Sequence, residues 1–311
     1  MMKHYSVLLQ ESIDSLVIKP NGIYVDGTLG RAGHSSEILK MIPLGHLYCF
    51  DKDAQAISES SVKLSKISSN FTCIHSGFKN LQNELSKFDV QEIDGMILDL
   101  GVSSPQFDEA ARGFSYRFDA PLDMRMDQSQ DLNAAIVVNT YEFNDLVKIF
   151  YRYGEDQLAK QVARKIERAR EIKPIETTFE LVNIIKSAYP AKILNSKGHP
   201  AKKIFQAIRI EVNDELNELE IVLEQAIQML KIGGRLSVIS FQSLEDRIVK
   251  DTFNRYGTMP KIDKRIPLMP GQIETAPFKV ITKKPILANE EELKENNRSH
   301  SAKLRVIERV K

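Results

Sequence analysis

The chain has 311 residues, of which 42% are hydrophobic and 27% charged, and its formal net charge is +1. These values are typical of a globular protein of about two domains, and they exclude a chain that is polycationic throughout. The sequence has no apolar run of about 18 residues and no secretory signal, so we expect no membrane association and a cytoplasmic location. Cys49 and Cys73 are too few for a four-ligand zinc site or a disulfide framework, and we predict that both are reduced core residues.

Residues 22–101 alternate short apolar runs with segments of helical length. Each apolar run ends in polar residues or glycine, and the runs span residues 22–26, 45–51, 71–76 and 93–101. The segments between them, such as 34–42 and 53–67, are long enough to form helices. This alternation predicts a parallel β-sheet that is covered by helices.

The pattern changes after about residue 106, and residues 130–190 contain helical patterns without a convincing strand. A long helical stripe follows from about residue 203 and is closed by Gly233 and Gly234. Strand-like runs then return at 235–241, 278–286 and 302–310. We therefore predict an α/β core formed by residues 1–108 and 204–311, with an inserted, mainly helical domain at 109–203.

The first apolar run leads into the loop "DGTLGRAGHS" (26–35), which has glycines at positions 27, 30 and 33. Gly33 is followed by His34 and Ser35 instead of the Lys-Ser/Thr that ends a nucleoside-triphosphate loop. The glycine spacing also departs from the G-x-G-x-x-G fingerprint of dinucleotide-binding folds. By itself the loop is equally compatible with a strand-to-helix turn that only needs flexible residues.

Two acids and one aromatic residue follow the neighbouring strands. Asp51 ends the second predicted strand, where an acid can accept hydrogen bonds from both hydroxyls of a ribose, and Asp99 ends the fourth strand at the same crevice. Phe78 follows the third strand and can stack on an adenine. A ribose acid, an adenine platform and a loop without a phosphate cradle suit S-adenosylmethionine, whose cationic sulfonium favours nearby carboxylates.

The fourth strand continues into "LDLGVSSPQFD" (98–108), in which Ser104-Pro105-Gln106-Phe107 resembles the Ser-Pro-Pro-Tyr loop of amino-methylating nucleic-acid methyltransferases. The exocyclic amine of cytosine is a poor nucleophile because its lone pair is delocalised into the ring. The Ser104 hydroxyl and the carbonyls of Ser104 or Pro105 can hold the amine toward a methyl group, and Phe107 can stack on an unstacked base. We therefore predict a positioning role for Ser104, Pro105 and Phe107. A tight proline turn is the alternative interpretation.

Long strings along nearly the whole chain resemble the bacterial 16S ribosomal RNA cytosine-N4 methyltransferase family, the RsmH or MraW proteins. The strings are "HYSVLLQES" (4–12), "DGTLGRAGHS" (26–35), "LDLGVSSPQFD" (98–108), "RGFSYRFDAPLDMRMD" (112–127), "HPAKKIFQAIRIEVNDEL" (199–216), "ISFQSLEDRIVK" (239–250) and "SAKLRVIER" (301–309).

This resemblance implies a Rossmann-like class I methyltransferase core with an inserted all-helical domain. It also implies methylation at N4 of one cytosine in the decoding region of 16S rRNA, within the small ribosomal subunit. The S-adenosylmethionine contacts that it implies are Ala32, Gly33, His34, Asp51, Phe78, Asp99 and Gln106.

The chain departs from the family pattern at several positions. Ala32 stands where glycine is common, and Ser6 stands where proline is usual. Gln242 replaces a usual histidine, so we assign no general base there. Asn297 and His300 replace a usual proline and arginine, and we expect this change to weaken one RNA contact.

Positive charge is concentrated between residues 148 and 203, which contain 13 Lys or Arg and 6 Asp or Glu in a chain of net charge +1. This asymmetry predicts that the helical insertion faces RNA, and a solvated helix surface is the alternative. Further candidate phosphate contacts come from the segment after residue 108 and from a predicted helix start: Arg112, Arg117, Arg125, Lys202 and Lys203. His34 and His199 have no partners at ligand spacing, so we expect no metal.

Two other functions are compatible with parts of this pattern. A nicotinamide-dependent oxidoreductase can have the same fold class, but it lacks a matching glycine fingerprint and explains nothing after residue 98. A non-catalytic RNA-binding assembly factor is the second alternative, and the intact loop at 104–107 argues against it. The pattern does not determine the oligomeric state.

Overall fold

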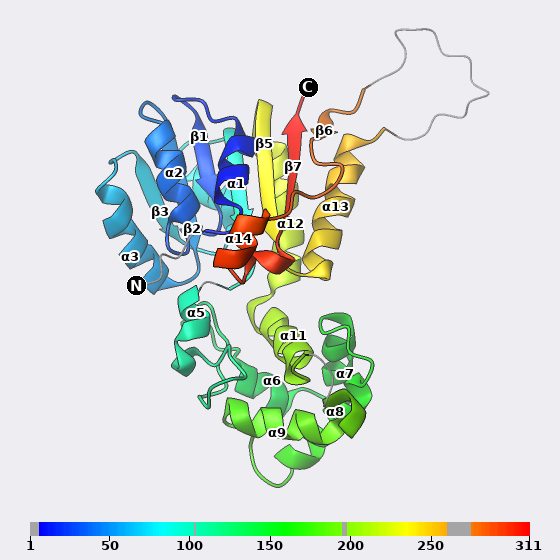
Figure 1. Ribbon diagram of the computed structural model, residues 1–311. Helices are drawn as coiled ribbons and strands as arrows, with labels where there is room; N and C mark the ends of the chain where they lie inside the picture. Colours follow the sequence, from blue (N-terminus) through cyan, green and yellow to red (C-terminus); the bar gives the residue numbers. More distant parts are fainter. Residues whose placement is uncertain (1–5, 103, 195–197, 260–274) are drawn as a thin grey trace, which may run out of the picture. The chain divides into compact units, whose positions relative to one another are not determined.

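The computed structural model of the protein describes residues 6–102, 104–194, 198–259 and 275–311. The chain divides into two compact units (Figure 1). The sheet unit comprises Met1–Gly101 and Asn217–Lys311, and the helical unit comprises Val102–Leu216. Each unit has a hydrophobic core of its own.

In the described part of the sheet unit, seven strands form one sheet in the order β3-β2-β1-β4-β5-β7-β6 (Figure 1). Strands β1 to β5 pair in parallel, and β7 is antiparallel to β5 and to β6. The strands are β1 Ile23–Asp26, β2 His46–Asp51, β3 Phe71–His75, β4 Ile93–Asp99, β5 Leu230–Ser240, β6 Phe278–Val280 and β7 Lys303–Arg309. The predicted α/β, Rossmann-like fold is confirmed.

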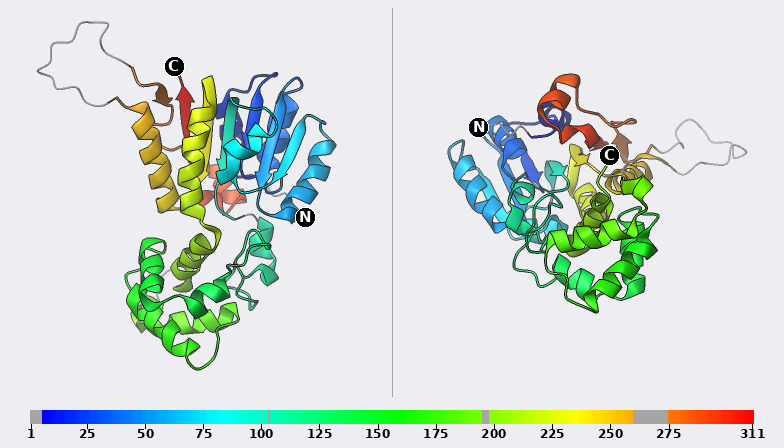
Figure 2. Two further views of the ribbon diagram at one scale, coloured as in Figure 1. Left: turned by 180° about the vertical axis from the view of Figure 1, so that it is seen from behind. Right: turned by 60° about the horizontal axis from the view of Figure 1, so that its bottom comes forward.

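Helices cover both faces of this sheet (Figure 2). Alternate strand residues point to opposite faces, so Leu47 and Cys49 of β2 belong to one apolar cluster while Tyr48 and Phe50 belong to another. Helices α1, α2 and α3 contribute to the first cluster, and α4, α12 and α13 to the second. The helices of this unit are α1 Leu9–Leu16, α2 Gly33–Met41, α3 Ala54–Ser65, α4 Leu81–Ser86, α12 Glu215–Met229, α13 Ser243–Gly257 and α14 Glu290–Glu295.

The helical unit buries the apolar stripes of its helices against one another. Its helices are α5 Ser104–Asp108, α6 Ala134–Thr140, α7 Phe143–Arg152, α8 Ala159–Arg170, α9 Thr178–Ala188, α10 Ala191–Leu194 and α11 Ala201–Asn213. Helix α9 begins with a capping box, in which Thr177 Oγ1 accepts from the Glu180 N–H at 3.3 Å and Glu180 Oε2 accepts from the Thr177 N–H at 3.2 Å. Nowhere in the described residues does a helix have both the length and the apolar surface needed to cross a membrane.

The boundaries of the helical unit, at residues 102 and 216, differ from the predicted boundaries at 109 and 203. The long helical stripe after residue 203 consists of two helices, because Asp214 adopts a left-handed φ of 53° and ends α11. Helix α11 buries Ile204, Phe205 and Ile208 in the core of the helical unit, whereas α12 packs against the sheet. Apolar periodicity continues across Asp214 and therefore does not reveal the break.

Candidate functional site

Asp26, the last residue of β1, anchors the glycine loop. Its Oδ1 accepts from the Thr28 N–H at 3.0 Å, and its Oδ2 accepts from the Ser35 hydroxyl at 2.6 Å. The loop also passes close to β4, since a Cβ on Gly27 would lie 2.5 Å from Leu98 Cδ2. Buried Asp26 therefore fixes the conformation of the loop from inside, through hydrogen bonds that sequence spacing did not predict.

The junction between the loop and α2 is tightly packed. Ala32 caps α2 with a φ of 54°, in the left-handed region that favours glycine. A Cβ on Gly33 would lie 1.7 Å from Ser6 Oγ, so a side chain at position 33 displaces the N-terminal segment. At these two predicted cofactor contacts, the groups that can bind a ligand are those of the backbone at the start of α2.

Asp51, at the end of β2, is oriented by two backbone N–H groups. Its Oδ2 accepts from the Gly30 N–H at 2.8 Å, and its Oδ1 accepts from the Asp53 N–H at 2.9 Å. Burial raises the pKa of Asp51 to about 6, although both hydrogen bonds act in the opposite direction. Each carboxylate oxygen has a second lone pair, so Asp51 can still accept hydrogen bonds from two hydroxyls of a ligand.

Phe78 opens the short helix η1 Phe78–Asn80 after β3, and its side chain is half-buried. The buried carboxylate of Glu218, on α12, holds this turn against the end of β2. Its Oε2 lies 2.7 Å from Lys52 Nζ, and its Oε1 lies 2.9 Å from Lys79 Nζ. Glu218 could not be predicted from the sequence, because its two partners are far away along the chain and no local motif marks it.

Asp99, at the end of β4, has a buried oxygen without a hydrogen-bond partner. Its backbone N–H donates to Thr28 Oγ1 at 2.7 Å, which ties β4 to the glycine loop. Its side-chain Oδ1 is buried and unpaired among the residues that the structure describes. Burial, reinforced by the nearby Asp26 carboxylate, raises the pKa of Asp99 to about 8. Such a carboxyl group favours a ligand that brings a donor or a positive charge.

His34, in the first turn of α2, lies beside Asp99. Its Nδ1 is 3.9 Å from Asp99 Oδ2, and its Nε2 is 3.2 Å from the Val7 carbonyl oxygen. Burial lowers the pKa of His34, which favours the neutral ring. Because a carbonyl oxygen only accepts, the proton of the neutral ring belongs on Nε2, and Nδ1 is left as an acceptor toward Asp99.

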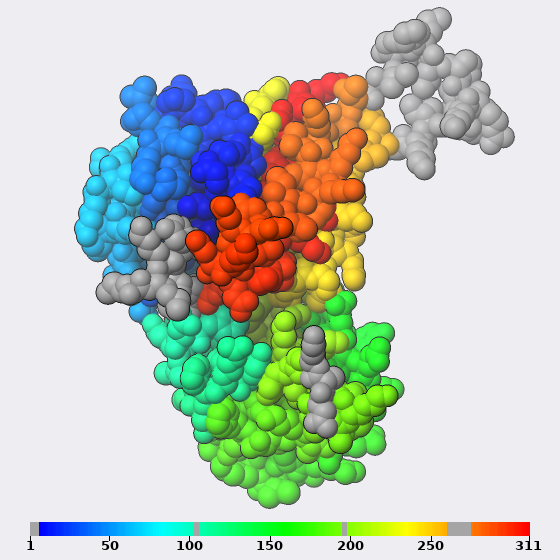
Figure 3. All heavy atoms as spheres, in the orientation of Figure 1, coloured from blue at the N-terminus to red at the C-terminus, as the bar shows by residue number. Residues whose placement is uncertain are grey.

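The N-terminal segment that contacts His34 is itself held by the C-terminal part of the chain. Glu292 of α14 accepts from the Leu8 N–H at 2.9 Å and from the Ser299 hydroxyl at 2.7 Å. Figure 3 shows this orange-red segment beside the blue N-terminal helix. Asn297 and His300, two of the departures from the family pattern, are exposed in the same C-terminal segment.

Gln242, a third departure, has a structural role at the start of α13. The backbone N–H groups of Phe241 and Gln242 donate to Glu245 Oε2 at 2.9 and 3.1 Å, and Gln242 Nε2 donates to Glu245 Oε1 at 3.1 Å. Gln242 thus caps the helix together with Glu245, and its amide side chain cannot act as a general base.

The predicted amine-positioning residues lie on α5, a short helix of the helical unit, whereas their sequence pattern predicts a loop of the α/β core. Gln106 is buried, and Phe107 packs with its ring centroid 6.5 Å from that of Phe114. The side chains of Ser104 and Pro105 lie outside the described part of the structure. Phe107 therefore contributes to the core of the helical unit, with which it is partly buried.

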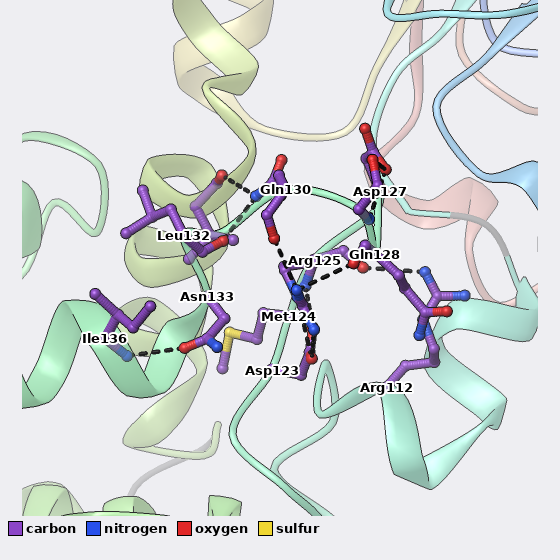
Figure 4. A network of polar contacts seen from close by, with 12 residues as sticks. Arg112, Asp123, Met124, Arg125, Asp127, Gln128, Gln130, Leu132, Asn133 and Ile136 are labelled. Carbon is purple, nitrogen blue, oxygen red and sulfur yellow. Dashed lines mark hydrogen bonds and ion pairs between the residues drawn. The ribbon is translucent and has the colours of Figure 1, made fainter.

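Two of the predicted RNA-contacting arginines form hydrogen bonds within their own unit (Figure 4). The guanidinium of Arg112 donates to the carbonyl oxygens of Arg125 and Met126, each at 3.0 Å. Arg125 pairs with Asp123 at 2.7 Å and also donates to the Gln130 carbonyl oxygen at 2.7 Å. These bonds hold the loop after α5 together, so both arginines have a structural role in their own unit. Their predicted contacts with phosphates stay a prediction.

The other predicted RNA contacts lie on the surface of the helical unit. Arg117 and Lys202 are exposed. Lys203 is exposed as well, and its Nζ donates to the Glu155 carbonyl oxygen at 2.9 Å. His199, which stacks on Tyr116 at a centroid distance of 4.5 Å, packs within the unit. Among the described residues, no group of three or more His, Cys, Asp or Glu side chains is arranged to hold a metal ion.

Within the sheet unit, the structure brings together the glycine loop, Asp51, Asp99 and His34. This donor set fits S-adenosylmethionine, because Asp51 can accept from ribose hydroxyls and Asp99 has an unpaired buried oxygen for a donor or cationic group. Phe78, another predicted contact, follows β3 in the same unit, whereas Gln106 belongs to the helical unit.

Comparison with known proteins shows that the sequence matches one protein family along nearly its whole length. The sequence model of the MraW methylase family matches residues 1–310. Ribosomal RNA small subunit methyltransferase H of Limosilactobacillus fermentum is 55% identical over 310 residues, which cover 99% of this chain and 98% of the relative. The protein of the same name from Exiguobacterium sibiricum is 53% identical over 311 residues, which cover 100% of this chain and 99% of the relative. The solved structure of an rRNA methylase from Streptococcus thermophilus is 14% identical, with a TM-score of 0.43 over 100% of this chain and 99% of that one, a likeness too weak to carry an argument.

Proposed function

The chain belongs to the MraW methylase family, and on that premise we propose that it transfers a methyl group to the N4 amine of a cytosine in the decoding region of 16S rRNA. The family match over residues 1–310 is the observation that carries this proposal. Relatives that are 53% and 55% identical are named as methyltransferases of the small-subunit ribosomal RNA, which supports the choice of substrate. The cytosine and its N4 atom rest on the resemblance of residues 98–108 to amino-methylating enzymes.

S-adenosylmethionine is the methyl donor, as predicted from the sequence, and when bound it supplies an electrophilic methyl group on a sulfonium. In the proposed site, Asp51 holds the ribose hydroxyls, Phe78 contacts the adenine and Asp99 meets a donor group of the cofactor. The start of α2, with Ala32, Gly33 and His34, and Gln106 complete the proposed contacts. A carboxylate-lined site also favours a cationic cofactor over its neutral product.

The proposed chemistry needs positioning more than acid–base catalysis. Acceptors at Ser104 or Pro105 hold the N–H groups of the amine, so that its nitrogen lone pair faces the methyl group. If the Ser104 hydroxyl is such an acceptor, Ser104→Ala slows methyl transfer without changing cofactor affinity, whereas Gln106→Ala raises the cofactor Kd. Single-turnover methylation with both ligands saturating separates these effects. A wild-type rate in Ser104→Ala rejects the role of the hydroxyl.

The proposed partner is 16S rRNA within the small ribosomal subunit, and the proposed location is the cytoplasm. In this proposal the helical unit binds the RNA. Arg117, Lys202 and Lys203 are the exposed members of the predicted phosphate contacts. Membership of a methylase family leaves the nicotinamide-dependent oxidoreductase without support. A non-catalytic RNA-binding assembly factor is the alternative function, and an experiment must distinguish it from a methyltransferase.

The test is transfer of a labelled methyl group to naked 16S rRNA, isolated 30S subunits and 70S ribosomes, followed by digestion and nucleoside mapping. We expect label in N4-methylcytidine from one position in the decoding region. Label in another nucleoside or at another position refutes the proposed target. Tight rRNA binding without any transfer in the presence of S-adenosylmethionine favours the assembly factor.

A further inference from the structure

Helix α8 (Ala159–Arg170) belongs to the helical unit and is labelled in Figure 1. Its side chains form one apolar face and one basic face. Ala159, Val162, Ala163 and Ile166 are buried in the core of the unit. The exposed positions of the helix lie on the opposite side, as the helical period requires, and they are Lys160, Gln161, Arg164, Lys165 and Arg168. Four of these five side chains are cationic, and we call Lys160, Arg164, Lys165 and Arg168 the α8 basic face.

This concentration of charge is not neutralised within the described residues, where none of the four cations forms an ion pair with an acid. Lys160, Arg164 and Arg168 follow one another at intervals of four, and like charges at that spacing destabilise a helix. Lys160 also lies in the first turn, where the helix dipole disfavours a cation. Arg168 lies in the last turn, where the dipole favours a cation, so the unfavourable terms are the position of Lys160 and the like-charge spacing. Because no ion pair in the described residues offsets these two terms, they point to a function outside the fold.

Other cations of the same unit have hydrogen-bond or ion-pair partners within it, in contrast to the α8 basic face. Arg170, on the same helix, turns inward and donates to the carbonyl oxygens of Val138 and Tyr141 at 3.0 and 2.7 Å. Lys173 pairs with Glu180 at 2.8 Å. On the basic face, only Arg164 has a described contact, a cation–π contact 5.8 Å from the centroid of Phe143. That contact fixes the direction of the guanidinium and leaves its charge uncompensated.

The chemistry of the face selects a polyanionic partner with regularly spaced charges. Lys160 and Arg168 are eight residues apart, which corresponds to about 12 Å along the helix axis. One strand of a nucleic-acid duplex presents three or four phosphates over about that length. The exposed positions of α8 include no aromatic side chain on which a base could stack, so the face suits a phosphate backbone better than single-stranded bases.

We propose that the α8 basic face binds the phosphate backbone of a double-helical segment of small-subunit rRNA. The proposal rests on the proposed function for the identity of the RNA. It assigns phosphate binding to one described face of the helical insertion that the sequence predicts to face RNA, and the contact is independent of base sequence.

The test compares two triple variants that remove the same charge. Lys160→Gln/Arg164→Gln/Arg168→Gln neutralises the face, and Lys66→Gln/Lys250→Gln/Lys284→Gln neutralises three exposed lysines of the sheet unit. Binding to transcribed 16S rRNA is measured by filter retention over a range of salt concentrations. Three phosphate contacts account for a slope of about 2–3 in the plot of log K against log salt, so the α8 variant loses that slope and binds about 100-fold more weakly at 0.15 M salt. The control variant keeps the slope of the wild type.

A wild-type slope and affinity in the α8 variant overturn the proposal. The proposal also falls if the variant binds 16S rRNA normally but loses binding to phosphatidylglycerol vesicles, because the face is then a membrane contact. Circular dichroism and an unchanged cofactor Kd verify folding. If the triple variant is unfolded, the three single variants replace it, each with an expected loss of about 0.7–0.9 in slope. Failure of the proposed function is a separate result, in which wild-type protein binds 16S rRNA with the full slope but transfers no methyl group.

Discussion

Replacement of Asp99 by asparagine tests whether the fold resists ionisation at the end of β4. Asp99 Oδ1 is buried without a partner in the described structure, and the pKa of the carboxyl is raised from 3.8 to about 8. A folded-state pKa above the unfolded value means that the folded protein binds this proton more tightly. The stabilising contribution is therefore complete below about pH 4 and is lost as the pH rises through about 8. Asparagine resembles the protonated acid in shape and cannot ionise.

The magnitude follows from the size of the shift. A shift of about 4 pKa units corresponds to at most about 5–6 kcal/mol. The Asp99 side chain is 27% exposed, so solvent screens part of this cost. We expect roughly half of that limit, about 2–3 kcal/mol, as the gain in stability of Asp99→Asn at pH 9 relative to the wild type. Below pH 4 the pair should have nearly the same stability.

Urea unfolding of both proteins without cofactor, followed by circular dichroism at pH 5, 7 and 9, measures this difference. The free energy of unfolding of Asp99→Asn minus that of the wild type should increase steadily between pH 5 and pH 9. Effects of titrating groups far from Asp99 cancel in the difference, because they are shared by both proteins. His34, which lies 3.9 Å from Asp99, is replaced by glutamine in both proteins so that its titration does not contribute. A difference that stays constant across this range refutes the argument that burial opposes the Asp99 charge.

Three further changes have defined outcomes. Asp51→Asn replaces an acceptor of backbone N–H groups with a group that is partly a donor. Cofactor binding, measured by calorimetry, should therefore weaken by about 1.5–3 kcal/mol. Unchanged affinity in a folded variant would remove Asp51 from the site. Lys160→Glu places an acid in the first turn of α8 and pairs it with Arg164, so thermal unfolding should show about 0.5–1.5 kcal/mol of stabilisation while the salt slope of rRNA binding falls. A destabilised Lys160→Glu variant contradicts the like-charge argument. Glu218→Gln removes the charge between two lysines, and urea unfolding should show a loss of about 1.5–3 kcal/mol, whereas wild-type stability would show that the two ion pairs contribute nothing net.

The sheet and the acids at its edge could be predicted from the sequence for the same physical reason. Parallel strands that are buried on both faces appear as continuous apolar runs, and the polar residues that end those runs lie at one edge of the sheet. Asp51 and Asp99 were predicted in this way, and each connects to the glycine loop in the structure. Their roles toward the cofactor stay predictions.

Other parts of the site could not be predicted, because they depend on contacts between distant residues or on single backbone angles. Glu218 meets Lys52 and Lys79 only in the folded sheet unit. The break at Asp214 depends on one left-handed residue within an uninterrupted apolar stripe. The sequence shows only that Arg112 is positively charged. It does not distinguish an arginine that donates hydrogen bonds to carbonyl oxygens of its own loop, as Arg112 does, from an arginine that is available to bind a phosphate.

Strands β4 and β5 are hydrogen-bonded neighbours, yet the whole helical unit separates them along the chain. During synthesis, roughly 130 residues must follow Asp99 before Leu230 begins β5, which takes on the order of 10 s at about 5–20 residues per second. For that time one edge of β4, six of whose seven residues are buried in the folded protein, can pair with another nascent chain. Slower translation of residues 102–216 therefore prolongs exposure of this edge and should lower the yield of folded enzyme, whereas an equal delay after β5 should have little effect.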